Sequence, residues 1–295
     1  MWIWIFISTS FLKKNRDYLI FHKFSYIIVL DTLYLNKWKK QKMFDLSWKV
    51  AVITGASSGL WKQMAHWFAE QWADLVILAR RYEKLLELKE ELENEHSIKV
   101  YPIKCDITLT EDINNAADLA EKEFWKVDIL LNCAWDVRNG WLLEMKDEDW
   151  EFTIKVDLTG TFKVTRAFAE VMKKNNYWRI INIASMYGLV WCVNLPTIGY
   201  YASKWWVVNF TRAIAAELAQ YNITCNAICP WYFETELTIQ NLEKPEFKAF
   251  MNEHVPMKRY WRKWELNAGA VFLASDEASY ITWAILPIDW GYTAV

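Results

Sequence analysis

The residues best suited to chemistry are a tyrosine and a lysine one helical turn apart. Tyr200 and Lys204 are at i and i+4, so a helix would present both on one face. An ammonium beside a phenol favours the phenolate and lowers a pKa that is otherwise about 10. Ser185 follows an apolar run and is placed to hold a substrate oxygen. Together they predict an acid–base site, although a Tyr/Lys pair alone is more often part of a surface.

A turn of small residues precedes this site in the chain. Residues 54–61 read TGASSGLW and join a predicted strand to a predicted helix. Such a turn lets the backbone approach a pyrophosphate, and the helix N-terminus supplies N–H donors. An ordinary βα turn is the alternative. Its place in the first strand–helix–strand unit favours dinucleotide binding, with contacts from Gly55, Ser57, Ser58, Gly59 and Leu60.

Two arginines, Arg80 and Arg81, end the second predicted strand. A fold that binds NAD often carries Asp or Glu about 20 residues beyond the glycine turn, where it holds the ribose hydroxyls. Arginine there would instead pair with a 2′-phosphate. A solvated arginine pair is the alternative. The arginines favour NADP as cofactor, with NAD possible, and Arg80 as a contact.

Apolar runs and amphipathic segments alternate from Val50 onward. This alternation predicts a Rossmann-like α/β fold, a doubly wound parallel sheet with helices on both faces, in one domain. Ligands then bind at the carboxyl ends of the strands. The predicted strands are 50–54, 75–79, 100–104, 129–132, 180–184, 224–228 and 285–288, and the predicted helices are 59–71, 82–95, 111–123, 147–174, 200–220 and 263–273.

Composition excludes several classes of protein. The 295 residues are 54% hydrophobic and 24% charged, which is typical of a globular chain rather than a disordered one. With 34 Lys+Arg against 36 Asp+Glu, we expect no nucleic-acid and no membrane partner. The five scattered cysteines contain no CxxC pair, so we expect no zinc site and no disulfide framework. A reducing, cytoplasmic location follows.

The first 42 residues differ from the rest, being rich in aromatics and Lys and free of Gly and Pro. The apolar run Trp2–Ile7 is too short for a membrane span, and nothing around it resembles a signal peptide. We therefore divide the chain into an N-terminal extension, residues 1–42, outside the working protein, and a dinucleotide-binding oxidoreductase domain, residues 43–295.

Taken together, these residues resemble the short-chain dehydrogenase/reductase family, from about Phe44 to Val295. Further shared motifs stand in the family's order: Asp106 after the third strand, Asn132-Cys133-Ala134-Trp135 like NNAG, Pro230-Trp231 with Thr235 like PG…T, and Asp289-Trp290-Gly291 like DGG.

The resemblance implies an enzyme that moves hydride between nicotinamide C4 and a carbonyl or carbinol carbon. Ser185 and Tyr200 would hold the oxygen, and Tyr200 would exchange the proton. Lys204 would bind the nicotinamide ribose, and Asp157 would relay protons through water. Tyr200 and Lys204 thus also contact the cofactor, and the other contacts implied are Asp106, Ile107, Asn132, Ala134, Pro230 and Thr235.

Within the family, the chain looks most like the gluconate 5-dehydrogenase group, which implies a sugar-acid substrate of the gluconate/5-ketogluconate type. Residues 185–190, 229–238 and 276–282 carry this likeness. Arg138, Asn139, Asn194 and Lys258 are candidates to bind such a substrate. The 3-oxoacyl-acyl-carrier-protein reductases share the frame and are the alternative. A non-catalytic dinucleotide-binding scaffold or sensor is an alternative of another class. A homotetramer or homodimer is usual in the family.

Two departures from the family pattern concern the substrate side of the site. Asp157 stands where the family has Asn, and its charge would keep Lys204 protonated. The interval from Ser185 to Tyr200 is longer than usual, so an enlarged substrate loop is expected.

The larger departure is tryptophan where glycine is expected. The chain has 20 Trp and 8 Gly, whereas average usage predicts roughly 20 Gly. Random mutation would not choose one replacement so consistently, so we hypothesise that a codon meaning Gly in the source was read as Trp; UGA, one base from GGA, is the obvious candidate. A naturally Trp-rich enzyme is the alternative, and Trp150 fits the family as tryptophan. The affected positions are Trp61, Trp135, Trp231 and Trp290 within motifs, Trp205 and Trp206 after the catalytic Lys, and Trp48, Trp72, Trp125 and Trp178 before strands.

Overall fold

Seven short apolar runs form the strands of one sheet. The computed structural model describes residues 43–174, 177–191, 195–233, 242, 244–259 and 265–294. Most strands are buried along their whole length, as expected where helices cover both faces of a sheet. The strands are β1 (Val50–Thr54), β2 (Asp74–Ala79), β3 (Val100–Lys104), β4 (Ile129–Asn132), β5 (Trp178–Ile183), β6 (Ile223–Pro230) and β7 (Ile285–Ile288).

The sheet has the order β3-β2-β1-β4-β5-β6-β7, and every neighbouring pair is parallel. The chain therefore runs outward from β1 to β3, crosses back to β4 beside β1, and continues outward to β7. The direction of winding reverses between β1 and β4, which places a crevice at the carboxyl ends of these two strands. The predicted doubly wound, Rossmann-like sheet is confirmed.

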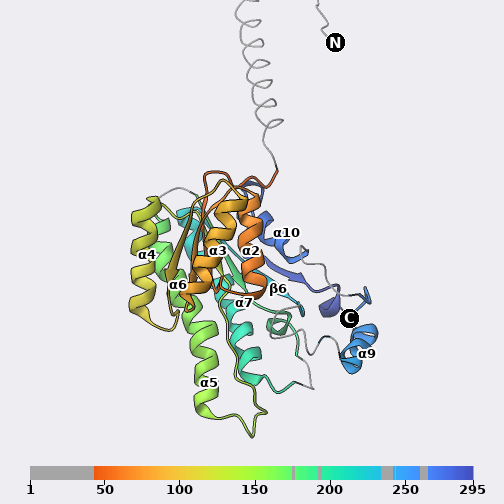
Figure 1. Ribbon diagram of the computed structural model, residues 1–295. Coiled ribbons are helices and arrows are strands. Elements are labelled where there is room, and N and C mark those ends of the chain that lie inside the picture. The colour runs from red at the N-terminus through yellow and green to blue at the C-terminus, as the bar shows by residue number, and fades with distance from the viewer. Residues whose placement is uncertain are drawn as a thin grey trace, which may run out of the picture. The chain divides into compact units, whose positions relative to one another are not determined.

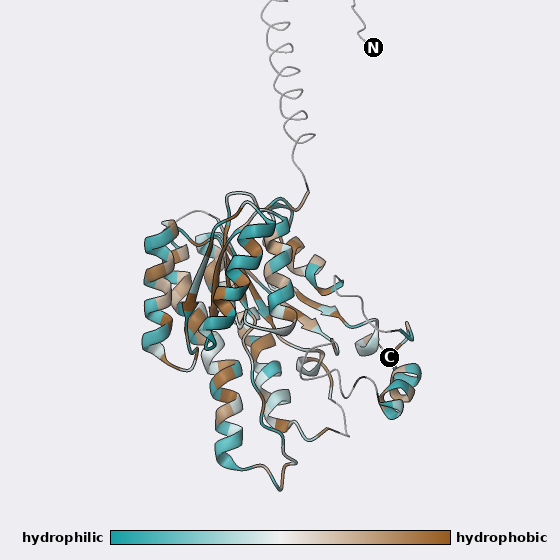
Figure 2. Cartoon of the chain, in the orientation of Figure 1, coloured by the Kyte–Doolittle hydropathy of each residue, from teal (hydrophilic) through white to brown (hydrophobic). Residues whose placement is uncertain are grey.

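Helices cover both faces of this sheet (Figure 1). Alternate residues of β1 belong to different cores: Ala51 and Ile53 pack with one helix set, Val50 and Val52 with the other. Brown strands between helices with teal outer faces display the same layering in Figure 2. One set is α2 (Gly59–Glu70), α3 (Tyr82–Glu95) and α10 (Glu265–Ala274); the other is α4 (Thr110–Phe124), α6 (Thr161–Met172) and α7 (Ile198–Leu218).

The predicted helix 147–174 is three segments. A helix α5 (Asp147–Ile154) and the helix α6 are joined by the π-helical turn η2 (Lys155–Gly160). Single π turns inside helices occur mostly at functional sites, and this one contains Asp157. Hydrophobic spacing over 28 residues cannot reveal one widened turn, so the sequence predicted a continuous helix.

Another helix was missed altogether. The helix α9 (Pro245–His254) starts with Pro at its first turn and buries Met251. It carries one strongly buried residue, so its apolar periodicity is weak. Among the described residues, no helix has both the length and the apolar character needed to cross a membrane. The predicted boundary between residues 42 and 43 stays a prediction, and residues 1–42 lie outside the described residues.

Candidate active site

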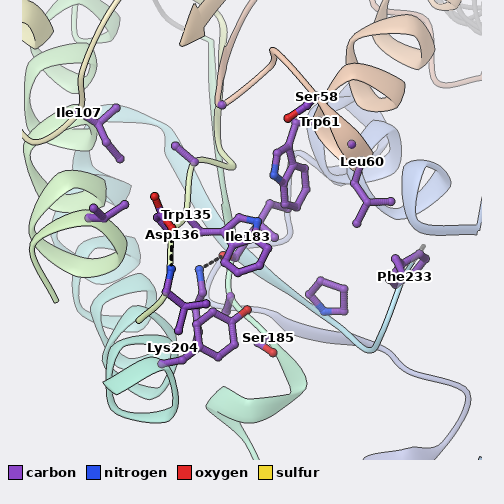
Figure 3. A pocket seen from close by; sticks show the side chains of 18 of the residues that line it. Ser58, Leu60, Trp61, Ile107, Trp135, Asp136, Ile183, Ser185, Lys204 and Phe233 are labelled. Carbon is purple, nitrogen blue, oxygen red and sulfur yellow. Dashed lines mark hydrogen bonds between the residues drawn. The ribbon is translucent and has the colours of Figure 1, made fainter. Parts of the chain in front are cut away.

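One cavity of about 1050 Å³ opens at the carboxyl ends of the strands (Figure 3). Its lining draws on the β1–α2 turn, the end of β2, the loop after β4 and the start of α7. Most predicted site residues meet here: Gly55, Ser57, Ser58, Gly59, Leu60, Arg80, Asp106, Ile107, Ala134, Ser185, Tyr200, Lys204 and Pro230. Thr235 and Asn194 lie outside the described residues.

The β1–α2 turn has the backbone of an anion cradle. Gly55 and Gly59 adopt left-handed conformations, with φ of 76° and 61°. A Cβ on Gly55 would lie 2.9 Å from the Ala134 Cα, so no larger residue fits there. Ser58 precedes α2 without capping it, and the first turn of α2 has no acidic side chain. The N–H groups at this helix end are therefore open to an anion such as a pyrophosphate.

Thr54 fixes the cradle against the neighbouring strand. Its Oγ1 accepts hydrogen bonds from the backbone N–H groups of Cys133 (2.9 Å) and Ala134 (3.0 Å). The hydroxyl thus ties the end of β1 to the loop after β4, across the crevice between the two halves of the sheet. Thr54 was not predicted as a site residue, because its hydrogen-bond partners are backbone groups far away in the sequence.

The two arginines after β2 behave differently. Arg81 Nη2 donates to the Ser57 hydroxyl (3.1 Å) and the Ser58 hydroxyl (2.5 Å), so its guanidinium reaches the phosphate turn. Arg80 pairs with Asp136 at 3.3 Å and is largely exposed. Both line the cavity, but Arg81, which was not singled out as a contact, is the one held against the turn.

Two residues that were predicted to contact the cofactor, Asn132 and Asp106, make hydrogen bonds within the protein instead or in addition. Asn132 is absent from the cavity lining; its Nδ2 donates to Thr165 Oγ1 (2.9 Å) and Asn182 Oδ1 (2.8 Å), joining β4 to α6 and β5. The Asp106 carboxylate accepts the backbone N–H of Thr108 (2.9 Å), which shapes the loop after β3 while the residue still lines the cavity. Sequence spacing predicted where both residues lie along the chain, but it could not predict the direction in which the Asn132 side chain points.

Ser185, Tyr200 and Lys204, which come from two elements, all line the cavity. Figure 3 shows Ser185 and Lys204 in its wall. Ser185 precedes the short 3-10 turn η3 (Met186–Gly188) and caps it by accepting the Tyr187 N–H at 3.2 Å. Lys204 Nζ lies 5.4 Å from the centre of the Tyr200 ring and donates to the Ile183 carbonyl at 3.3 Å. Lys204 is almost fully buried, so its ammonium needs these partners.

Asp157 supplies the counter-charge. Its Oδ2 lies 3.6 Å from Lys204 Nζ and accepts from the Ser203 hydroxyl at 3.3 Å, while Oδ1 accepts the Asp136 N–H at 3.0 Å. The carboxyl is fully buried behind Lys204 and does not line the cavity. Burial raises its pKa, and the Lys204 ammonium opposes that rise. Asp157 therefore acts on the site through Lys204 rather than by touching a substrate.

The electrostatics of Tyr200 differ from the expectation. Burial raises the pKa of the phenol, the Asp157 carboxylate raises it further, and a hydrogen bond with Ser185 lowers it. The prediction of a phenol acidified by Lys204 left out the burial of the phenol, which raises its pKa most, and the nearby Asp157 carboxylate, which raises it further. In this structure the phenol is held protonated, the form that donates a proton.

The cavity fits a dinucleotide in part. The phosphate turn, Arg81 and the Ser185/Tyr200/Lys204 group match its phosphates and its reactive end. Three indoles do not fit a bound dinucleotide. The side chains of Trp61, Trp135 and Trp231 line the cavity and occupy part of its space, and the Trp135 ring lies 5.7 Å from that of Tyr200.

Within the part of the chain that the structure describes, one group of possible metal ligands lies outside the cavity. Side-chain atoms of His66, Glu95 and His96 fall within 4.8 Å of one another. His66 already faces Glu91 at 3.3 Å and Glu95 at 3.4 Å, which makes it a partner of carboxylates at a surface. None of these residues lines the cavity.

Comparisons with known proteins agree with the geometry. Residues 55–293 match the sequence profile of a family described as enoyl-(acyl carrier protein) reductase. The 3-oxoacyl-[acyl-carrier-protein] reductase of Aquifex aeolicus is 32% identical over 246 residues, 83% of this chain and 98% of that protein. Galactitol 2-dehydrogenase (L-tagatose-forming) of Cereibacter sphaeroides is 36% identical over 253 residues, 85% of this chain and 97% of that protein.

A solved structure is similar over the same extent. The gluconate 5-dehydrogenase of Burkholderia cenocepacia, in complex with NADP and tartrate, superposes with a TM-score of 0.81 at 30% identity, covering 85% of this chain and 98% of that one. The fold, the cavity and these matches lead to one conclusion. The chain belongs to the short-chain dehydrogenase/reductase family of NAD(P)-binding oxidoreductases.

Proposed function

We propose that the protein interconverts a ketone and a secondary alcohol with NADP(H), and that the substrate is a sugar acid of the gluconate/5-ketogluconate type. The observation that carries the chemistry is the convergence of Ser185, Tyr200 and buried Lys204 on one cavity. When bound, the cofactor would supply or accept the hydride.

The chain's own groups handle the proton and the oxygen. In reduction, the Ser185 hydroxyl and the Tyr200 phenol hydrogen-bond the substrate oxygen, and Tyr200 donates the proton. Lys204 stabilises the phenolate that remains, because an ammonium nearby favours the charged form. Asp157 and the Ile183 carbonyl hold Lys204 in place.

Two features support a sugar acid. Arg138 and Asn139 line the cavity and offer a cation and an amide to a carboxylate and hydroxyls. The similar gluconate 5-dehydrogenase was solved with NADP and tartrate, a hydroxylated dicarboxylate. Of the other proposed lip residues, Lys258 is described but does not line the cavity.

A 3-oxoacyl-acyl-carrier-protein reductase is the second candidate. Proteins of that name from Aquifex aeolicus and Thermotoga maritima are 32% and 34% identical to this chain. The apolar side chains of Met186, Leu195 and Phe233 in the cavity would suit an acyl chain. Such a substrate also needs a basic surface beside the cavity mouth for its carrier.

NADPH oxidation measured with 5-ketogluconate and with an acetoacetyl thioester separates the two candidates. We expect a higher kcat/KM for 5-ketogluconate. Tyr200→Phe should lower kcat by roughly 100-fold or more, as expected for loss of a general acid, and leave NADPH affinity unchanged. Turnover close to that of the parent chain in Tyr200→Phe would refute the assignment.

We further propose a homotetramer or homodimer in the cytoplasm, with residues 43–295 as the working domain. The exposed aromatic side chain of Phe162 on α6 supports contact between copies through this helix. Light scattering on the purified full chain tests the oligomer, and a monomer at micromolar concentration would contradict it.

A further inference from the structure

Tryptophan dominates the strained backbone positions of this protein. Eight described residues other than glycine have a positive φ, and five of them are Trp48, Trp72, Trp125, Trp283 and Trp290, at φ of 55–68°. In this region the Cβ of an L-residue crowds the backbone, so glycine is the residue that adopts it freely. A bulky aromatic there is unusual once, and five instances in one chain require a common cause.

The places of these residues in the fold are those of glycine. Trp125 follows α4 as its left-handed cap, and its N–H returns to the Glu121 carbonyl. Trp72 stands just after the cap of α2, and its N–H returns to the Ala69 carbonyl. Glycine is the usual residue at such helix ends. Trp48 and Trp283 stand in the turns before β1 and β7.

Packing offers no compensation for the strain at the most exposed of these positions. The Trp48 side chain is 87% exposed and that of Trp125 84% exposed. An indole in water contributes little burial, so it cannot offset a disfavoured backbone. Nothing in the described structure explains tryptophan at these two turns.

In the cavity, too, tryptophan stands at positions where it fits poorly. Trp231 is buried, yet its indole N–H has no hydrogen-bond partner among the described residues. Its ring lies 5.6 Å from that of Trp290, which does not itself line the cavity. The indoles of Trp61 and Trp135 also take up room in the cavity (Figure 3), and the Trp135 ring lies 5.7 Å from that of Tyr200. Glycine at these positions would widen the groove along the path of a dinucleotide.

We infer that the working form of this protein carries glycine at residues 48, 72, 125, 283 and 290, and at the cavity positions 61, 135 and 231. A codon that the source reads as glycine then stands as tryptophan in the printed sequence. The inference about the cavity rests on the proposed function, whereas that about the five left-handed positions rests on backbone geometry alone.

A stability comparison on the full chain tests the left-handed set. Trp125→Gly should raise Tm by roughly 2–4 °C, because it removes left-handed strain. Trp125→Ala also removes the indole but keeps the Cβ, so it should gain nothing. Trp150→Gly, in the right-handed helix α5, should lower Tm. Equal gains from Gly and Ala at 125, or a gain at 150, would overturn the inference.

A binding comparison tests the cavity. A full chain with glycine at 61, 135 and 231 should bind NADPH more than tenfold tighter than the chain with tryptophan at these positions, a gain of about 1.4 kcal/mol or more. Equal affinity of both chains overturns the cavity inference. Tight NADPH binding without turnover on any ketone supports it and counts instead against the proposed function.

Peptide mass spectrometry of the protein isolated from its source does not depend on how well either chain folds. We expect peptides that cover residues 48, 125 and 283 to have the masses of glycine-containing peptides. Masses of tryptophan-containing peptides at these positions would overturn the inference.

Discussion

At the scale of single residues, the site depends on a buried ion pair. Lys204 and Asp157 are both nearly or fully buried and 3.6 Å apart. Removing one partner of such a pair leaves an uncompensated charge, whereas together they stabilise each other. The pair fixes Lys204 beneath the Tyr200 ring, but its carboxylate also opposes ionisation of the phenol. Burial raises the pKa of Tyr200 most, and the charge of Asp157 raises it further, so we expect Asp157 to influence the pH profile of the reaction.

Asp157→Asn should move the pH profile. The Asp157 carboxylate raises the pKa of Tyr200, so a neutral amide of the same shape lets that pKa fall. Alcohol oxidation needs the phenolate, and its rise in kcat with pH should therefore shift to lower pH. The measurement is kcat for oxidation across pH in both chains.

Ser203→Ala is the matched control for that change. It removes a hydrogen bond to Asp157 but leaves the carboxylate charge in place. Its profile should stay close to that of the parent chain. If Asp157→Asn lowers kcat equally at every pH, the residue positions Lys204 without tuning Tyr200.

Arg81 is expected to select the phosphorylated cofactor. Its guanidinium already lies against Ser57 and Ser58 in the phosphate turn. A charge-assisted hydrogen bond contributes about 1.5–3 kcal/mol, so Arg81→Ala should weaken NADPH binding roughly 10- to 100-fold. NADH lacks the 2′-phosphate, and its affinity should hardly change. Isothermal titration with both cofactors measures the effect.

Arg138→Ala serves as the control for general loss of positive charge, since Arg138 also lines the cavity but lies in the loop after β4. It should affect both cofactors alike. An equal loss of NADPH and NADH affinity in Arg81→Ala would mean that Arg81 orders the turn without reading the 2′-phosphate.

At the scale of elements, η3 must sit tightly on α7 for Ser185 to face Tyr200. A Cβ on Gly188 would lie 2.7 Å from the Lys204 carbonyl oxygen, which is closer than backbone contact allows. Gly188→Ala should therefore push η3 away from α7, lowering Tm by several degrees and kcat by about tenfold or more, as overpacking and misplacement of the site predict. Thermal unfolding and turnover are both measured.

Gly199→Ala, in the helix α7 on which η3 packs, is the control. A Cβ there would meet Thr153 at 3.5 Å, an ordinary contact, and alanine favours helix more than glycine does. Its Tm should stay equal or rise. If Gly188→Ala behaves in the same way, η3 is not held by this close approach.

The elements that sequence predicts well are those with a strong local pattern. Residues 50–54, 100–104, 129–132 and 285–288 were predicted as strands with the observed bounds, because short apolar runs between turns carry the signal. The helix 82–95 was likewise predicted with its observed ends. The π turn and α9 were missed, since one depends on a widened turn and the other on weak periodicity.

The same distinction between local and tertiary contacts separates the site residues that were predicted from those that were missed. Tyr200 and Lys204 share a helical face through local spacing, so the sequence could pair them. The hydrogen bonds of Thr54 and Asn132 reach residues on other strands and helices, and no local spacing encodes such contacts. The burial of Tyr200 and the nearby charge of Asp157, which both raise the pKa of the phenol, are likewise tertiary effects, so the sequence predicted the opposite direction.

At the scale of the whole molecule, the cysteines report on the integrity of the packed layers. Four described cysteines are buried, and they lie in different cores: Cys133 on one side of the sheet, Cys105 and Cys225 on the other, and Cys229 beside α7. Burial raises the pKa of each thiol, for Cys105 and Cys229 to about 12. Although Cys105 lines the cavity, all four thiols are buried, so reagents reach them poorly and the raised pKa values disfavour the reactive thiolate.

Labelling of these four thiols should therefore follow global unfolding. We expect a Cys192→Ser chain, which removes the cysteine outside the described residues, to react slowly with a thiol reagent in native buffer. In denaturant it should take up four equivalents at once. Because the thiols lie on both faces of the sheet, their native labelling rates should converge on one unfolding rate when reclosing is slower than labelling. Fast reaction of Cys133 alone would instead mean that the loop after β4 opens locally, beside Tyr200, while the rest of the sheet stays closed.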